Sequence, residues 1–252
     1  MNYLIGDIGN TSLKICKINN KFRIVKTFLF RTKSVYLEKN LKKKINQLAK
    51  NNTCNKILFS SVVPHIYRKI DKIFRKKNFK IFEIKKFDLN KLLKFRVKRY
   101  SQLGSDRIAN AIGAYYKFKT NCIVIDFGTA TTFDVIKKPG MYDGGVITPG
   151  IALSIENLFS STALLPTFKL KKYPTNYGKN TKEALNSGFF WGYQGLINNI
   201  VKKIIKKNNK NFKVILTGGY SNLFKNKIFK QAIIENDITI QGILKVYRKF
   251  LI

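Results

Sequence analysis

Short apolar runs alternate with lysine-rich amphipathic stretches along the chain, a pattern typical of an α/β protein. The first half opens with three apolar or alternating stretches joined by Gly-Asn and Asn-Asn turns, which predicts an antiparallel meander. Helices and strands then alternate, with an irregular basic connection at Lys85–Tyr100. The predicted strands are Tyr3–Ile8, Ser12–Ile18, Phe22–Phe30, Lys56–Val63 and Phe79–Ile84, and the predicted helices are Tyr36–Lys50, His65–Lys77 and Asp106–Phe118.

The second half repeats this order. Three strands are again followed by alternating helix and strand, which describes a ribonuclease-H-like α/β unit present twice. The acetate/sugar kinase, Hsp70 and actin superfamily is built this way, so we expect two such domains, residues 1–118 and 119–252, with ATP in an interdomain cleft. The predicted strands are Cys122–Asp126, Thr132–Ile136, Tyr142–Ile147, Phe212–Leu216 and a short one at Thr239–Ile240, and the predicted helices are Ile151–Phe159, Thr181–Lys206 and a terminal helix.

The same local motif stands at the end of the first strand of each half. An apolar strand ends in Asp7 and then Gly9, and another ends in Asp126 and then Gly128, each followed by small polar residues. A carboxylate beside a permissive glycine turn suits a cation and the phosphates that accompany it. The stretch after Asp7 alone also reads as an ordinary Gly-Asn hairpin. The second copy favours a duplicated phosphate site.

A second acid, Asp106, opens a well-patterned helix. In one interpretation Ser105 is the N-cap and Asp106 complements the helix dipole. In the other, Asp106 accepts the proton of a substrate hydroxyl while Arg107 meets a carboxylate or phosphate. Both interpretations agree with the residues.

Three further stretches are candidates for close contact with a ligand. The run from Asp143 to Gly150 is dense in glycine, and Thr217-Gly218-Gly219 follows a strand where adenosine could lie with no side chain in the way. Thr181 lies in a segment that also reads as a helix start, capped by Asn180 and Glu183.

Composition narrows the class of protein. Cys16 and Cys122 lie in apolar strand patterns and indicate buried thiols, and the lone His65 indicates a surface helix position. No run approaches a membrane span and no signal peptide is recognisable, so we expect a cytoplasmic protein. The 49 basic and 13 acidic residues give a net charge of +36, which would suggest binding to nucleic acid or to an anionic membrane. The basic residues are dispersed, however, and the enrichment of Lys, Asn, Ile and Phe is also explained by A/T-rich codons.

The ordered motifs together resemble type III pantothenate kinase from residue 3 to about residue 242. They are D-I-G-N-T, S-S-V-V-P, G-S-D-R-I-A-N, D-F-G-T-A-T-T, G-G-V-I-T-P-G, G-K-N-T and T-G-G. The resemblance implies ATP-dependent phosphorylation of pantothenate by a homodimer, with Mg²⁺ and a monovalent cation, K⁺ or NH₄⁺.

The resemblance also implies roles for individual residues. Asp106 would be the catalytic base, Asp126 would bind the monovalent cation, and Thr129 would contact ATP. The first ATP loop would comprise Asp7, Ile8, Gly9, Asn10, Thr11, Ser12, Leu13 and Lys14. The pantothenate contacts would be Gly104, Ser105, Asp106, Arg107 and, near the dimer interface, Thr181.

The chain departs from the family pattern in one region. Many members have a tyrosine nine residues before the catalytic aspartate, where this chain has Val97, and a proline where it has Tyr100. Two other functions compatible with the sequence are a nucleic-acid-binding protein that kept the fold and a kinase of another small hydroxylated acid. The three acids Asp7, Asp106 and Asp126, in an acid-poor chain, argue against a pure nucleic-acid binder.

Overall fold

The computed structural model describes residues 2–32, 45, 47, 54–170, 173–229 and 231–252. Most of the predicted helix Tyr36–Lys50 lies outside the described residues. The chain divides into two compact units, one comprising residues 1–117, 140–142 and 237–252, the other residues 118–139 and 143–236. The second unit thus begins at Phe118, and the C-terminal helix belongs to the first unit.

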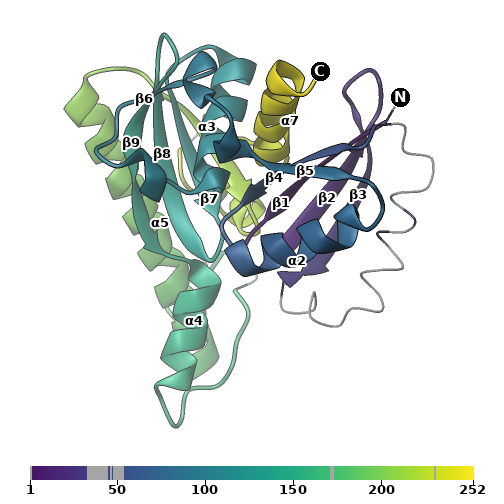
Figure 1. The fold of residues 1–252 in the computed structure, drawn as a ribbon. Helices are drawn as coiled ribbons and strands as arrows, with labels where there is room; N and C mark the ends of the chain where they lie inside the picture. Colours follow the sequence, from purple (N-terminus) through teal and green to yellow (C-terminus); the bar gives the residue numbers. More distant parts are fainter. Residues whose placement is uncertain (1, 33–44, 46, 48–53, 171–172, 230) are drawn as a thin grey trace. The chain divides into compact units, whose positions relative to one another are not determined.

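The first unit is built on a five-stranded sheet of order β3-β2-β1-β4-β5 (Figure 1). Strands β1, β2 and β3 form the expected antiparallel meander, whereas β4 and β5 run parallel to β1. The strands are β1 (Tyr3–Ile8), β2 (Ser12–Ile18), β3 (Ile24–Arg31), β4 (Lys56–Ser61) and β5 (Lys80–Glu83).

Helices cover this sheet because their apolar faces repeat at helical spacing. Helix α2 (Pro64–Arg75) lies across the sheet and buries Ile66, Ile70 and Phe74 against it (Figure 1). Helices α3 (Ser105–Phe118) and α7 (Ile238–Phe250) approach each other closely. A methyl group at Gly242 would collide with the Ala109 backbone, so glycine permits this approach.

Between β5 and α3 the chain forms short elements where the sequence predicts an irregular connection. They are the 3₁₀ turns η2 (Ile84–Lys86), η3 (Leu89–Lys91) and η4 (Tyr100–Gln102) and the two-residue strand β6 (Lys94–Phe95). Strand β6 pairs with Met141 and Tyr142, which belong to the same unit.

The second unit repeats the strand order of the first. Its strands run in the order β9-β8-β7-β10-β11, with β7 antiparallel to β8 and parallel to β10, and β6 makes this sheet six-stranded by pairing with β9. Strand β7 therefore holds the central position that β1 holds in the first unit. The strands are β7 (Cys122–Phe127), β8 (Ala130–Lys137), β9 (Met141–Pro149), β10 (Lys213–Gly218) and β11 (Ile233–Ile234).

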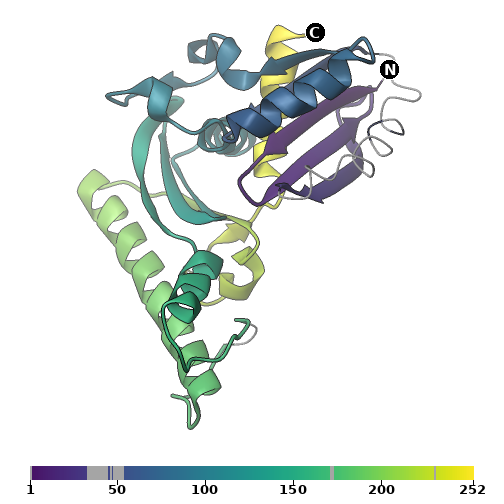
Figure 2. The ribbon, with the colours of Figure 1, turned by 60° about the horizontal axis from the view of Figure 1, so that its bottom comes forward.

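Three helices accompany this second sheet, α4 (Ile151–Ser160), α5 (Thr181–Asn208) and α6 (Ser221–Phe224). Helix α5 packs Phe190, Ile197 and Val201 into the core. Figure 2 shows α4 beside the first half of α5. The predicted capping of α5 is confirmed, because Asn180 Oδ1 accepts a hydrogen bond of 3.0 Å from the Glu183 N–H.

Two local predictions are wrong and two buried-thiol predictions are confirmed. Thr239–Ile240 does not form a strand but lies in the first turn of α7. Ser105 is the first residue of α3 rather than its N-cap, since the Gly104 carbonyl accepts the Ile108 N–H. Cys16 and Cys122 are buried free thiols. No helix in the described part of the chain is long and apolar enough to cross a membrane.

Candidate functional site

In the first unit, Asp7 ends the central strand between two polar neighbours. Its register partners are Lys14 on β2 and Ser60 on β4. Residues directly opposite each other in a sheet project from the same face, so Asp7, Lys14 and Ser60 share one face. The Ser60 hydroxyl is fully buried and has no hydrogen-bond partner among the described residues. An unpaired buried hydroxyl beside a carboxylate fits a site for a hydrated cation or a phosphate.

The turn after Asp7 is a hairpin with a fixed backbone, so the hairpin interpretation is confirmed as geometry. The Gly9 N–H donates to the Ser12 carbonyl at 2.9 Å, and the Thr32 hydroxyl donates to the Gly9 carbonyl at 2.7 Å. The Lys14 ammonium forms an ion pair of 2.6 Å with Asp237 at the start of α7. Any phosphate that Lys14 contacts therefore competes with a carboxylate of the same unit.

The second candidate site acid of the first unit, Asp106, lies in the first turn of α3. Its carboxylate accepts the Arg107 N–H at 2.7 Å and lies against Gly104, where a methyl group would collide with it. Burial raises the pKa of the Asp106 carboxyl above its ordinary value of 3.8, and the hydrogen bond and charge of Arg107 oppose that rise. A buried carboxylate whose basicity is raised, at a helix start, can accept a proton from a bound hydroxyl.

Ser105 makes a contact that the sequence does not reveal. Its hydroxyl donates to the Glu83 carboxylate at 2.6 Å. Glu83 is the last residue of β5 and Asp7 the next-to-last residue of β1, so an acid near the end of an apolar strand was the available signal. Burial raises the pKa of the Glu83 carboxyl, and hydrogen bonds from Ser105 and Lys85 oppose that rise.

In the second unit, Asp126 lies near the end of the central strand, with Thr132 and Thr217 opposite it on the neighbouring strands. Glycine backbone surrounds its carboxylate. A methyl group built on Gly218, whose φ is +85°, would lie 2.7 Å from Asp126 Oδ1, and one on Gly128 would lie 3.9 Å away. A side chain at position 218 would therefore collide with this carboxylate, so glycine is required there.

A second glycine contact fixes the backbone around Thr129. The Gly150 N–H donates to the Thr129 carbonyl at 3.1 Å, and a methyl group at Gly150 would collide with that carbonyl. The Gly219 N–H donates to the Phe127 carbonyl at 3.1 Å. The glycine-rich segment before α4 and the Thr-Gly-Gly segment thus both pack against the turn that follows Asp126.

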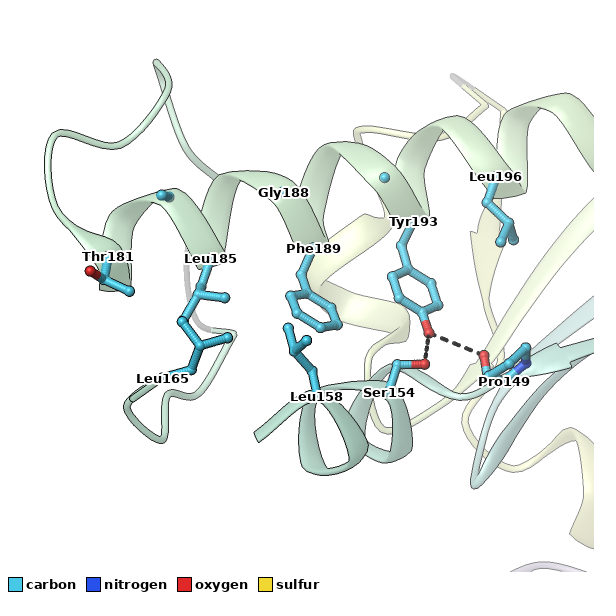
Figure 3. Close-up of a pocket in the computed structure, with 12 residues that line it drawn as sticks. Pro149, Ser154, Leu158, Leu165, Thr181, Leu185, Gly188, Phe189, Tyr193 and Leu196 are labelled. Atoms are coloured by element: carbon cyan, nitrogen blue, oxygen red, sulfur yellow. Dashed lines mark hydrogen bonds between the residues drawn. The ribbon is translucent and has the colours of Figure 1, made fainter. Parts of the chain in front are cut away.

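Thr181 does not lie with Asp126 and Thr129. It lines an apolar groove of about 630 Å³ between α4 and α5. Figure 3 shows Thr181 at one end of this groove and Pro149 at the other, with the Tyr193 hydroxyl hydrogen-bonded to Ser154 and to the Pro149 carbonyl. The groove is lined by Pro149, Ser154, Leu158, Leu165, Thr181, Ala184, Leu185, Gly188, Phe189, Gly192, Tyr193 and Leu196.

The donor set fits cations held by single carboxylates. Within the described ranges, no three His, Cys, Asp or Glu side chains gather as a metal site. Mg²⁺ in nucleotide sites keeps several waters and needs only one or two carboxylates besides the phosphates. The Asp7 carboxylate, with the Ser60 hydroxyl on the same face of the sheet, can provide such a ligand. K⁺ is held by oxygen dipoles, and Asp126 with exposed glycine backbone offers such oxygens.

Comparison with known proteins gives a consistent result. Residues 3–203 match the family model of type III pantothenate kinase. The chain is 47% identical over 243 residues to the type III pantothenate kinase of Pelagibacter ubique, an alignment that covers 96% of this chain and 97% of the relative.

Solved structures share the fold at lower identity. A Campylobacter jejuni protein described as a Baf family transcriptional activator superposes with a TM-score of 0.62 at 23% identity, over 98% of both chains. A Listeria monocytogenes protein described as an N-acetylmannosamine kinase superposes with a TM-score of 0.56 at 11% identity, over 99% of both chains. These structures support the expected α/β class with two sheets. From the family model and the Pelagibacter relative, the chain belongs to the type III pantothenate kinase family.

Proposed function

We propose that this chain transfers the γ-phosphoryl group of ATP to the primary hydroxyl of pantothenate, giving 4′-phosphopantothenate, the first step of coenzyme A biosynthesis. The observation that carries the proposal is family membership over nearly the whole chain, together with three acids that stand in motifs resembling those of the family. Asp7 and Asp126 end the central strands of two sheets with the same strand order, and Asp106 opens α3.

Asp106 is the catalytic base in this proposal. A helix N-terminus and the adjacent Arg107 favour its ionised form, while burial raises its basicity. With Oδ1 occupied by the Arg107 N–H, the other carboxylate oxygen accepts the proton of the pantothenate hydroxyl. Such a base orients the hydroxyl and takes its proton as the phosphoryl group transfers.

The phosphates lie on the two glycine turns. Asp7 to Lys14 form the first ATP loop, Asp7 holds the waters of a divalent cation, and Thr129 contacts ATP from the second turn. Bound Mg²⁺ supplies charge neutralisation for the triphosphate. Lys14 exchanges its ion pair with Asp237 for a phosphate oxygen, and Asp126 holds K⁺ or NH₄⁺.

Pantothenate lies against Gly104, Ser105, Asp106 and Arg107. Because the Ser105 hydroxyl donates its proton to Glu83, Ser105 can contact the substrate through its backbone N–H or as an acceptor. Arg107 suits the pantothenate carboxylate. Val97 and Tyr100 give this pocket a wall that differs from many members of the family. We place the reaction in the cytoplasm.

The α4–α5 groove is the homodimer surface in this proposal, and Thr181 reaches the substrate near that interface. Large apolar side chains are exposed on this part of the unit, among them Leu164 at 93% and Trp191 at 40%. Gly188 and Gly192 line the groove, and a methyl group on either meets nothing within 4 Å. Small residues on a helix face allow a second helix to approach closely.

Replacing Gly192 with leucine is expected to separate the dimer without destabilising the single chain. The added side chain projects into open space, and leucine favours helix more than glycine does. Light scattering after size exclusion should give twice the 29.1 kDa chain mass for the wild type and the single mass for the variant. Lys206→Leu adds an exposed leucine to the same helix about four turns beyond Gly192 and outside the groove lining, so it should remain dimeric. A monomeric wild type or a dimeric Gly192→Leu would contradict the assignment.

Two assays test the function against its rivals. A coupled assay should detect ADP release that depends on both ATP and pantothenate, and a panel of small hydroxylated acids should give lower rates. The charge of +36 motivates a DNA titration at several salt concentrations. Steeply salt-dependent DNA binding without kinase activity would favour the nucleic-acid alternative. The retained acids favour the kinase.

A further inference from the structure

Glu83 connects three segments of the first unit through one carboxylate. Oε1 accepts the Ser105 hydroxyl at 2.6 Å, and Oε2 accepts the Lys85 N–H at 2.8 Å. The Ser61 backbone also favours the ionised form of this carboxylate and so lowers its pKa. Ser61 follows Ser60 at the end of β4, and Ser105 precedes Asp106 at the start of α3.

The bond to Ser105 holds the helix start in an unusual way. A serine that begins a helix commonly caps it by accepting backbone N–H groups, whereas this hydroxyl donates its proton outward to a carboxylate. Ser105 is only 2% exposed. Its packing and its hydrogen bond to Glu83 together hold the backbone from which the Asp106 side chain projects. A charge-assisted hydrogen bond of 2.6 Å is among the stronger and more directional contacts in a protein.

The chain contains only 13 acids, and keeping one partly buried is costly unless its hydrogen bonds are satisfied. A carboxylate whose two oxygens accept hydrogen bonds from Ser105 and Lys85 rigidifies the residues that it joins. Phosphoryl transfer depends on placement of the base to within a fraction of an ångström.

We propose that Glu83 is a positioning residue for phosphoryl transfer, which acts through Ser105 to hold Asp106 at the start of α3. Glu83 touches neither substrate nor phosphate in this arrangement. The inference rests on the proposed kinase function for its kinetic consequence, but its structural consequence is independent of turnover.

Glu83→Gln keeps the size of the side chain but removes its charge. If its single oxygen keeps the Lys85 N–H, the amide NH2 faces Ser105, and the charge-assisted bond from the Ser105 hydroxyl becomes a neutral bond of reversed direction. The variant is expected to lower kcat about tenfold, the effect of losing a charge-assisted hydrogen bond, with the KM for ATP within about twofold. Ser105→Ala should lower kcat similarly, and the double variant should be no worse than either single variant, because both remove the same contact.

Asp88→Asn is the matched control. Asp88 also accepts a backbone N–H, that of Asn90, in the same connection but does not bond to α3. The Asp88→Asn variant should leave kcat unchanged. If the kcat of Glu83→Gln matches this control, or if the Glu83 and Ser105 effects multiply, the proposal is wrong. A raised KM for ATP with normal kcat would instead assign Glu83 to the end of β4, where Ser60 and Ser61 lie. If Glu83→Gln does not fold, an unchanged kcat in Ser105→Ala would still overturn the proposal.

Amide hydrogen exchange separates this inference from the kinase proposal. The first turn of α3 should exchange faster in Glu83→Gln than in the wild type and Asp88→Asn, whether or not the protein phosphorylates pantothenate. Unchanged exchange would overturn the positioning role, whereas absent wild-type turnover with altered exchange would overturn only the proposed function.

Discussion

Asp106→Asn is expected to lower kcat by about 10²-fold or more, because it removes the group that takes the proton of the substrate hydroxyl. The asparagine oxygen can still accept the Arg107 N–H that Asp106 accepts at 2.7 Å, so the helix start keeps its geometry. Steady-state ADP release with ATP and pantothenate both varied measures the effect. Asp71→Asn removes an acid from an exposed ion pair on α2 and should have nearly wild-type activity. Near-normal turnover of Asp106→Asn would exclude Asp106 as the base.

The pH dependence gives this variant a second readout. Burial raises the pKa of Asp106 above 3.8, so the acidic limb of kcat/KM should lie above that value and vanish in Asp106→Asn.

The raised pKa in the folded state stabilises the fold below about 3.8, and this stabilisation is lost as the pH rises through the raised value. The variant should therefore melt at a higher temperature than the wild type at neutral pH, with the difference closing in acid.

Asp126→Asn is expected to lower kcat/KM at least about tenfold and to abolish the difference between rates in K⁺ and in Na⁺. The variant removes the one charged ligand that we assign to the monovalent cation, and contacts to charged groups contribute more than neutral ones. The register partners of Asp126, Thr132 and Thr217, are uncharged and cannot replace the carboxylate as a charged ligand. Rates in matched K⁺ and Na⁺ buffers measure the change.

Binding of the cation can also be observed without turnover. A ligand that binds only the folded state raises the melting temperature by mass action, so K⁺ should stabilise the wild type more than Na⁺ does. Asp71→Asn should keep this response and Asp126→Asn should lose it. An Asp126→Asn protein that still responds to K⁺ would place the monovalent cation elsewhere.

The sequence predicts the two central strands well, because their apolar runs end at acids followed by glycine. Asp7 and Asp126 accordingly lie at equivalent positions in sheets of the same order. Their partners across the sheet cannot be predicted from one strand alone. The placement of Ser60 beside Asp7 depends on a parallel pairing between segments some fifty residues apart.

The two wrong predictions, the strand at the start of α7 and the Ser105 N-cap of α3, are explained by contacts with residues outside these segments. Residues 238–240, Ile-Thr-Ile, are β-branched and alternate as a strand does. The apolar positions continue at helical spacing through Ile243 and Val246, and packing on the first unit decides for helix. Ser105 carries the usual N-cap residue type, but Glu83, which is distant in sequence, takes its hydroxyl. The groove beside Thr181 arises from the packing of α4 on α5 and has no motif in the sequence.

The most direct measurement is the identity of the product. Purified protein incubated with ATP, Mg²⁺, K⁺ and pantothenate should yield 4′-phosphopantothenate, seen by ³¹P and ¹H NMR as a phosphate ester on the primary hydroxyl, with one ADP formed for each ester. Asp106→Asn should yield almost none in the same time. ATP hydrolysis without ester formation, or an ester on another acid in preference to pantothenate, would contradict the proposed function.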